Sequence, residues 1–291
     1  MSELISIKFH KAGLLTTVQD LGRNGYQSFG VPISGVMDEN SAKIANWLVG
    51  NEENSPLVEM TLLGPKIEFG GEVQIALTVA DLSPKINGLE VSMYETITLK
   101  MGDILTFGRL KSGCRTYLAI RGNLQIQKWL NSASASPQNT LKLTPDSLIQ
   151  KGSELQTLSQ KLIAKRIYPI EKRPIFSNFE TIKVLAGPEF EQFSKIEIAH
   201  FFGYNHIITS DSNRMGYRLD NQMINEGKRD IISSGIVPGT IQVTNSGQPI
   251  ILMKDAQTSG GYFRFLNVIN EDLNKLGQMK PGDLIRFEMV N

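Results

Sequence analysis

Four polar side chains near the C-terminal end of the sequence follow a strand-like run, and a serine separates the last of them from two glycines. They are Lys254, Asp255, Gln257 and Thr258, and the glycines are Gly260 and Gly261. An aspartate accepts N–H hydrogen bonds, a lysine holds an anionic group, and glutamine and threonine supply neutral donors. Glycine lets the main chain approach a ligand or a neighbouring strand closely. The segment 255–262 is therefore a candidate site loop, and the alternative is an ordinary exposed turn after a buried strand.

A second polar segment lies near the N-terminus, in TTVQDLGRNGYQSFGVPISGVMD (16–38). It carries four glycines, shows no helical periodicity, and has three polar side chains at its head, Gln19, Asp20 and Arg23. Apolar residues along its whole length argue against disorder. A long run without regular structure inside a compact domain is usually functional. We therefore expect an ordered glycine-rich loop that converges with the C-terminal segment on one polar pocket.

The elements that position these segments are expected to be short strands. Apolar, often alternating runs bounded by Gly, Pro or Asn occur at 3–9, 67–69, 73–79, 89–93, 95–100, 104–107, 115–120, 181–185, 231–233, 240–243, 249–253 and 284–289. Such frequent short strands indicate a barrel or a sandwich rather than a doubly wound sheet. The runs 240–243 and 249–253 flank Asn245-Ser246-Gly247, which is a turn signal.

Few helices are expected. Asp38 is a suitable N-cap for a helix over 39–49, whose apolar residues share one face and which Gly50 ends. A second helix is expected near 188–193, restarting through 196–202, and a short third helix over 271–276. The fold class is thus mainly β, with two β-barrel-like lobes and few short helices.

Two pairs of similar segments indicate that the chain is organised in two halves. LLGPKIEF (62–69) resembles LAGPEFEQF (185–193), and MGDILTF (101–107) resembles PGDLIRF (281–287). The Gly-Asp pair of the second repeat suits a tight turn that feeds a strand. The predicted organisation is an N-terminal β lobe (1–160) with the glycine-rich loop, a basic, proline-containing linker (161–179), and a C-terminal β lobe (180–291) with the 255–262 site loop.

Composition narrows the class of protein. Thirty basic and 29 acidic residues give a formal net charge of +1, which favours neither nucleic acid nor a membrane surface as a partner. The single cysteine and three scattered histidines lack metal-ligand spacing, so no metal is expected. The sequence has no glycine-rich phosphate-binding motif and no nucleophile elbow. Without a signal peptide or a membrane-spanning apolar run, the expected location is the cytoplasm.

Several blocks, in the same order along nearly the whole chain, resemble the allophanate hydrolase subunit 2 family. They are TTVQDLGRNGYQSFGVPISGVMDENSAKIANWLVGN, LVEMTLLGPKIEF, SDSNRMGYRLD and GIVPGTIQVTNSGQPIILMKDAQTSGGY. That family includes the C-type subunits of 5-oxoprolinase, also called KipA-like proteins, and part of the carboxyltransferase domain of the biotin-dependent urea carboxylase. The resemblance implies two cyclophilin-like lobes and planar urea-like or lactam substrates.

The resemblance implies three alternative functions. The first is the C-type subunit of an ATP-dependent 5-oxoprolinase. It would act with a B-type subunit (allophanate hydrolase subunit 1 or KipI-like) and an A-type subunit (LamB/YcsF-like) to cleave 5-oxoproline to glutamate. In that case this chain binds no cofactor, and ATP is used by the complex. The second is a carboxyltransferase subunit of the urea or allophanate type that receives biotin in trans. The third is a non-catalytic regulatory partner of a KipI-like kinase inhibitor.

For a small amide substrate, the residues suggest distinct roles. Asp255 orients or deprotonates the substrate nitrogen, and Arg23 or Arg214 neutralises the substrate's charge. The alternative for Arg214, which lies in the block SNRMGYRLD, is that it pairs with Asp211 or Asp220 to hold a loop. The predicted substrate-binding residues are Gln19, Asp20, Lys254, Gln257, Thr258, Gly260 and Gly261.

Several positions depart from the family's pattern. Val79 and Asn123 stand where the family usually has glycine. The stretch Asn131–Ala135 stands where the family usually has Gly-Ser-x-Ser-Thr, and Ala256 stands where it often has a basic residue. Loss of small residues near a site blocks close approach of a substrate, and loss of the threonine hydroxyl removes a donor. These positions therefore bear on catalytic competence.

Overall fold

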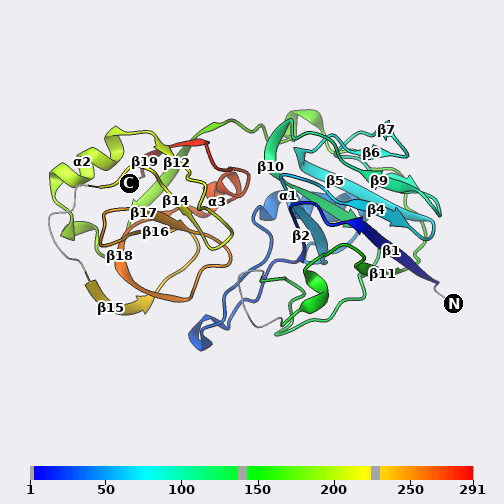
Figure 1. The fold of residues 1–291 in the computed structure, drawn as a ribbon, viewed down its shortest axis with the longest axis horizontal. Coiled ribbons are helices and arrows are strands. Elements are labelled where there is room, and N and C mark those ends of the chain that lie inside the picture. Colours follow the sequence, from blue (N-terminus) through cyan, green and yellow to red (C-terminus); the bar gives the residue numbers. More distant parts are fainter. Residues whose placement is uncertain (1–2, 137–142, 224–229, 291) are drawn as a thin grey trace. The chain divides into compact units, whose positions relative to one another are not determined.

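The computed structural model describes residues 3–136, 143–223 and 230–290 (Figure 1). Strands dominate this part of the chain, which contains three α-helices, and the curled sheets form half-barrels. The predicted mainly-β fold with barrel-like lobes and few short helices is confirmed.

The chain divides into two compact units. The first comprises Met1–Arg23 and Ser34–Phe176, and the second comprises Asn24–Ile33 and Ser177–Asn291. The middle of the predicted glycine-rich loop thus belongs to the second unit. The predicted linker 161–179 contains the point where the chain passes from Phe176 to Ser177, and the predicted lobe boundaries stay predictions.

Two antiparallel sheets form the first unit. The six-stranded sheet has the order β11-β1-β4-β9-β6-β7, with β1 (Leu4–Lys11), β4 (Lys66–Phe69), β6 (Lys85–Ile86), β7 (Leu89–Glu90), β9 (Ile104–Thr106) and β11 (Glu154–Leu158). The five-stranded sheet has the order β2-β3-β10-β5-β8, with β2 (Leu15–Gln19), β3 (Leu57–Thr61), β5 (Val73–Asp81), β8 (Ile97–Leu99) and β10 (Ser112–Ile120).

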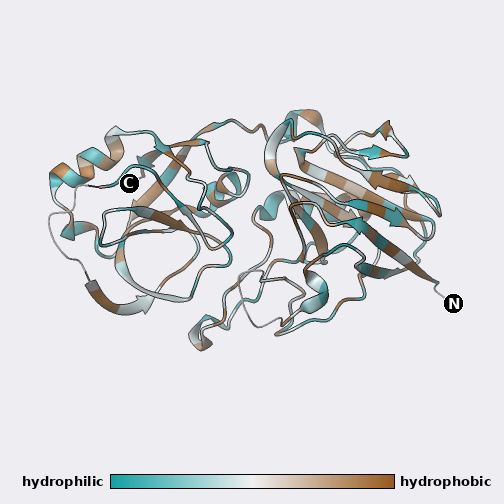
Figure 2. Cartoon of the chain, in the orientation of Figure 1, coloured by the Kyte–Doolittle hydropathy of each residue, from teal (hydrophilic) through white to brown (hydrophobic). Residues whose placement is uncertain are grey.

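Strand alternation directs side chains from both sheets into one core. In β1 it buries Ile5, Ile7 and Phe9, and these join a cluster with residues of β5 and β10. Figure 2 shows the apolar stretches along the strands of this unit. The opposite face of β5 and β10 packs against helix α1 (Glu39–Val49), where Ala76 and Tyr117 are fully buried. Because both faces of β5 are covered, all of its residues from Val73 to Ala80 are buried, including the polar Gln74 and Thr78.

Helix α1 has the predicted bounds and ends. The side chain of Asp38 accepts a hydrogen bond from the Ser41 N–H at 3.1 Å, which satisfies one of the free N–H groups of the first turn. Gly50 ends the helix in a left-handed conformation with φ of 71°. The predicted capping aspartate and terminal glycine are confirmed.

One sheet forms the core of the second unit. Its order is β13-β19-β12-β18-β16-β17-β14, with β15 paired to β18. The strands are β12 (Phe179–Ala186), β13 (His206–Ile207), β14 (Gly216–Arg218), β15 (Asp230–Gly235), β16 (Thr240–Val243), β17 (Pro249–Leu252), β18 (Ser259–Val268) and β19 (Leu284–Met289). The predicted pairing of 240–243 with 249–253 is confirmed, with Ile241 opposite Ile251.

Helices α2 (Lys195–Gly203) and α3 (Asn270–Leu276) lie close to the predicted positions. The predicted helix at 188–193 is wrong, because only the 3-10 turn Phe190–Gln192 forms there. The preceding main chain is held to β18 instead: Gly187 N–H donates to the Phe265 carbonyl at 2.8 Å and Glu189 N–H to the Arg264 carbonyl at 3.3 Å. These bonds to a strand replace the bonds that a helix would make.

Three other local predictions differ from the structure. Residues 15–19, which include the head of the predicted glycine-rich loop, form strand β2 because they pair with β3. The predicted strand 89–93 shrinks to Leu89–Glu90. The glycines of the predicted 255–262 loop lie in β18 and pair with β15.

Gly64 and Gly187 are the glycines of the Gly-Pro pairs in the similar segments 62–69 and 185–193, and neither position has room for a side chain. A Cβ atom on Gly187 would lie 2.1 Å from the Arg264 carbonyl oxygen, and one on Gly64 would lie 2.3 Å from the Phe107 side chain. The contact at Gly187 is with main chain, which cannot rotate away. The glycine of each Gly-Pro pair therefore permits close packing against a neighbouring segment.

We predict that Gly187→Ala lowers the free energy of unfolding by roughly 1–3 kcal/mol, because the new methyl group displaces the main chain of β18. Gly203→Ala is the matched control, since a Cβ atom there meets no atom within 4 Å. Urea denaturation followed by circular dichroism measures both. Equal stability of the two variants would contradict the packing argument.

Candidate functional site

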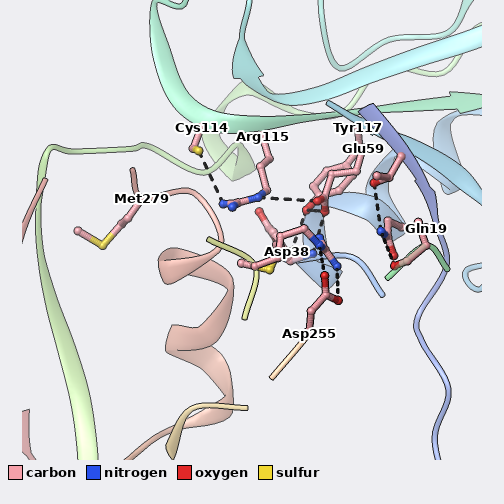
Figure 3. Close-up of polar contacts among 12 residues, drawn as sticks. Gln19, Asp38, Glu59, Cys114, Arg115, Tyr117, Asp255 and Met279 are labelled. Atoms are coloured by element: carbon pink, nitrogen blue, oxygen red, sulfur yellow. Dashed lines mark hydrogen bonds and ion pairs between the residues drawn. The ribbon is translucent and has the colours of Figure 1, made fainter. Parts of the chain in front are cut away.

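The predicted catalytic residues Asp255 and Arg214 form a buried ion pair in the second unit. Arg214 Nε donates to Asp255 Oδ2 at 2.8 Å, and Nη2 donates to Oδ1 at 3.1 Å. The two side chains are 1% and 0% exposed. This bidentate geometry gives the strongest orientation that an arginine imposes on a carboxylate (Figure 3).

Pairing of β14 with β17 positions both residues. Gly216 lies opposite Leu252, and the main-chain bonding continues past the strand ends. Met253 N–H donates to the Met215 carbonyl and Asp255 N–H donates to the Arg214 carbonyl, each at 2.9 Å. The side chains at 214 and 255 are therefore neighbours because their main chains are bonded.

The alternative interpretation, that Arg214 pairs with Asp211 or Asp220, is wrong. Asp211 and Asp220 are exposed, and the Asp220 carboxylate accepts a hydrogen bond from the Ile207 N–H at 2.7 Å. Strand pairing brings the carboxylate of Asp255 to the Arg214 guanidinium, so this carboxylate binds it instead of the two aspartates that are closer in sequence.

The remaining predicted residues of this segment have mixed surroundings. Lys254 and Thr258 are half-buried and Gln257 is exposed. The Thr258 carbonyl accepts from the Ile236 N–H at 3.1 Å. A Cβ atom on Gly260 would lie 2.8 Å from Gln242 Nε2, so this glycine permits the approach of a neighbouring side chain. A Cβ atom on Gly261 would lie 3.3 Å from the Ile231 carbonyl oxygen of β15.

In the first unit, Asp20 is buried and accepts hydrogen bonds from four donors. They are the N–H groups of Gly22 and Ala133 at 2.9 and 2.7 Å and the hydroxyls of Ser132 and Ser134, both at 2.6 Å. A buried carboxylate needs such a set of donors. Asp20 therefore fixes the segment after β2 against residues 132–134.

Gln19 and Arg23 complete the same contact. Gln19 Nε2 donates to the Thr17 hydroxyl and to the Ala135 carbonyl, both at 3.1 Å. Gln19 Oε1 is buried and accepts no hydrogen bond from any residue that the structure describes. Arg23 donates to the carbonyls of Trp129 and Ser134, and its guanidinium lies 5.3 Å from the Trp129 ring centre.

The structure brings the predicted residues together in two groups. Gln19, Asp20 and Arg23 lie together in the first unit, whereas Arg214 and the 254–261 residues lie in the second. Their convergence on a single pocket stays a prediction.

The stretch 131–135 retains the groups that bind Asp20. Ser132 and Ser134 stand at the two serine positions of the family pattern, and their hydroxyls are the donors to Asp20. Asn131, which stands where glycine is usual, has φ of 62°. Asparagine tolerates this left-handed conformation better than most residues. The change at 131 thus preserves the local main chain.

A buried network around Glu59 was not predicted from the sequence. Glu59 in β3 lies opposite Tyr117 in β10, and its Oε2 accepts from the Tyr117 hydroxyl at 3.0 Å and from the Met37 N–H at 2.9 Å (Figure 3). The Tyr117 hydroxyl accepts from the Asp38 N–H at 2.8 Å. Arg115 Nε lies 3.7 Å from Glu59 Oε1. The charged residue within the apolar run LVEMT was the available signal, since a charge in a buried strand requires partners.

Burial, and then the negative charge of Glu59, raise the pKa of the Tyr117 hydroxyl well above its usual value. The phenol therefore stays protonated at neutral pH and donates to Glu59. The network holds the start of α1 through Asp38 and joins β3 to β10.

The described ranges 3–136, 143–223 and 230–290 contain no group of three or more His, Cys, Asp or Glu residues placed to hold a metal ion. None of their helices has the length and apolar character needed to cross a membrane.

Residues 29–289 match the family described as "Carboxyltransferase domain, subdomain A and B", and the chain belongs to this family. It is 34% identical to the C-type subunit of 5-oxoprolinase from Escherichia coli (strain K12), over 97% of this chain and 90% of that protein. The crystal structure of TTHA0988 has a TM-score of 0.88 and 27% identity, and covers 99% of this chain. The K. lactis urea amidolyase has a TM-score of 0.88 and 30% identity, and covers 98%. The chain spans 57% of TTHA0988 and 19% of the urea amidolyase.

We predict that Tyr117→Phe lowers the free energy of unfolding by about 1–3 kcal/mol at neutral pH, because Glu59 and the Asp38 N–H each lose a partner. The folded-state pKa of Tyr117 is raised, so the stability it contributes is full below the unfolded-state pKa of about 10 and is lost as pH rises above that value. The gap between wild type and variant therefore narrows on the alkaline side. Urea denaturation from about pH 8 to pH 11 measures this gap, and a constant gap would contradict the assignment.

Proposed function

We propose that the chain acts as the C-type subunit of an ATP-dependent 5-oxoprolinase, a hydrolase complex that cleaves the cyclic amide of 5-oxoproline to give glutamate. The observation that supports this proposal is the 34% identity to the Escherichia coli C-type protein over 97% of this chain and 90% of that protein. The partners would be a B-type protein of the allophanate hydrolase subunit 1 (KipI-like) kind and a LamB/YcsF-like A-type protein.

Asp255 is the group that we propose to contact the lactam, in the assembled complex, where the side chain that is 0% exposed in the chain alone becomes accessible. Lactam cleavage adds water to the carbonyl carbon, breaks the C–N bond and leaves a proton on the nitrogen. A carboxylate is suited to accept the lactam N–H, and each oxygen of Asp255 retains a lone pair besides its bond to Arg214. Because Arg214 is committed to Asp255, its role in this proposal is to position the carboxylate.

The other predicted residues have supporting roles in the proposal. Lys254, Gln257 and Thr258 would orient the substrate, since they follow β17 beside Asp255. Arg23 is engaged with two carbonyls, and Asp20 with four donors, so both would shape the site rather than react. ATP would be bound by the partner proteins, because this sequence lacks a phosphate-binding motif.

A second candidate is a carboxyltransferase subunit that receives carboxybiotin in trans and acts on a urea-type substrate. The similarity to the K. lactis urea amidolyase, with a TM-score of 0.88 at 30% identity, favours it. Both candidates use a planar amide or ureido group, which Asp255 and its donor neighbours suit equally.

The test is reconstitution of the chain with the LamB/YcsF-like and KipI-like proteins encoded by the same organism, supplied with ATP and 5-oxoproline. We predict that glutamate forms only with all three proteins. Asp255→Asn should lower the rate by roughly 10²–10³, the usual loss for one strong polar contact to the reacting group. Asp211→Asn is the matched control, because Asp211 is an exposed aspartate of the same unit.

Each alternative gives a different result in the same experiment. ATP turnover that depends on urea and on a biotinylated protein, without glutamate, supports the carboxyltransferase. A stable complex with the KipI-like protein and no turnover of either substrate supports a regulatory partner. Either result would contradict the oxoprolinase proposal, provided that the complex assembles with wild-type stability.

A further inference from the structure

The first unit contains a cavity of about 620 Å³ that includes none of the site residues predicted from the sequence. It lies at the end of β5 and the start of β10, next to the segments 90–95 and 173–176. Its lining includes Val79, Asp81, Met93, Tyr94, Arg173 and Phe176. Cavities of roughly 300–1,000 Å³ are typical of small-molecule sites. This one combines apolar side chains with five charged residues, Asp81, Glu90, Glu95, Lys111 and Arg173.

A break in the sheet shapes this cavity. Ser112 pairs with Asp81, but the next pair is Thr116 with Val79, so β10 bulges opposite β5. Bulges are common beside functional sites, where they redirect side chains. The bulge interrupts the ladder where Val79 lines the cavity.

Three non-glycine residues that line the cavity have positive φ angles. Val79, Ser83 and Tyr94 have φ of 78°, 53° and 62°. This conformation is unfavourable for a β-branched residue, and such strain gathers at ligand sites when surrounding contacts hold it. Here the Tyr94 hydroxyl accepts from the Val79 N–H at 3.1 Å, and the Tyr94 N–H donates to the Leu77 carbonyl at 2.8 Å. The family's usual glycine at position 79 would adopt the same φ without strain.

Arg173 is held rigidly in the cavity wall. Its Nε and Nη2 donate to the Tyr168 carbonyl at 3.2 and 3.1 Å, and its guanidinium lies 4.9 Å from the Tyr94 ring centre. Its Nη1 has no acceptor among the described residues, and none of their carboxylates pairs with it. A guanidinium fixed in this way keeps one face of donors for an incoming anion.

None of the three acidic residues of the lining pairs with Arg173. Asp81 lies 3.6 Å from Lys111, Glu95 lies 3.0 Å from Lys165, and Glu90 is exposed. Arg173 therefore keeps its positive charge beside the Tyr94 ring, and Asp38 is a second charged residue that acts on the Tyr94 hydroxyl.

Tyr94 supplies a second donor. Its hydroxyl oxygen accepts from Val79, and its own proton has no acceptor among the described residues. Burial raises the pKa of Tyr94 to about 12, so the phenol keeps this proton at neutral pH. Arg173 and Tyr94 thus present donors without matching acceptors, beside the apolar side chains of Val79, Met93 and Phe176.

We propose that this cavity binds a small organic carboxylate with an apolar ring, the carboxylate on Arg173 and Tyr94 and the ring against Val79, Met93 and Phe176. A carboxylate accepts from both donors and neutralises the guanidinium. The proposal does not depend on the oxoprolinase assignment, because it involves neither Asp255 nor Asp20.

Phenylacetate and its uncharged isostere phenylacetamide test the proposal on the full chain. Saturation-transfer NMR and calorimetry should show saturable binding of phenylacetate with a dissociation constant of about 1 mM or tighter, as its size allows. Phenylacetamide should bind at least about tenfold more weakly, because it lacks the charge. Equal binding of the two probes, or no binding of phenylacetate at about tenfold this concentration, overturns the proposal.

Two variants locate the binding. Arg173→Gln and Tyr94→Phe should each weaken phenylacetate binding, by about tenfold or more for the charged group. Arg166→Gln is the matched control: Arg166 also stacks on an aromatic ring, that of Trp47 at 5.2 Å, and binds a main-chain carbonyl, but it does not line the cavity. Unchanged affinity in both cavity variants, or an equal loss in Arg166→Gln, overturns the assignment.

Discussion

A charged side chain removed from water requires an opposite charge or a full set of hydrogen bonds, and in the second unit Arg214 and Asp255 meet this requirement together. Both side chains are almost completely buried, and two N–H groups of the guanidinium bind the two carboxylate oxygens. Removal of one partner from such a pair usually costs about 3–5 kcal/mol, because the other remains buried without its counter-charge. The turn after β17 and the start of β14 are therefore fixed to each other through side chains as well as main chain.

The first unit meets the same requirement with different sets of partners. Asp20 receives two main-chain N–H groups and two hydroxyls. Glu59 receives one N–H and the phenol of Tyr117, and it also pairs with Arg115 at 3.7 Å. The two sets of partners have different structural effects. The donors to Asp20 organise a loop contact, and Glu59 with Tyr117 joins two strands to the start of α1.

Local patterns in the sequence were enough to predict some elements. Asp38 and Gly50 mark the ends of α1, because a capping side chain and a left-handed glycine act within a few residues. The hairpin of β16 and β17 followed from alternation and a turn signal. The run 188–193 was misjudged, because hydrogen bonds from Gly187 and Glu189 to β18 decide its conformation, and those partners are distant in sequence.

The same division applies to the site. The sequence identified Asp255 and Arg214 as residues of interest, but the protein partners considered for Arg214 as the alternative to a substrate were its sequence neighbours Asp211 and Asp220. Strand pairing, which no short motif records, gives it Asp255 instead. The cavity beside Tyr94 was also beyond reach, because its donors come from segments at 94 and 173 that meet only in the fold. Types of residue were thus predictable, whereas their pairing was not.

A double-mutant cycle on Arg214 and Asp255 measures how strongly the two buried charges stabilise each other. Arg214→Met and Asp255→Leu, singly and together, are compared by urea denaturation of the whole chain. Each single variant should lose about 3–5 kcal/mol, and the double variant should lose less than the sum by roughly 2 kcal/mol or more, because neither charge remains unpaired. Additivity within about 0.5 kcal/mol would instead show that the two charges do not stabilise each other and that the pair does not fix the turn after β17 to the start of β14.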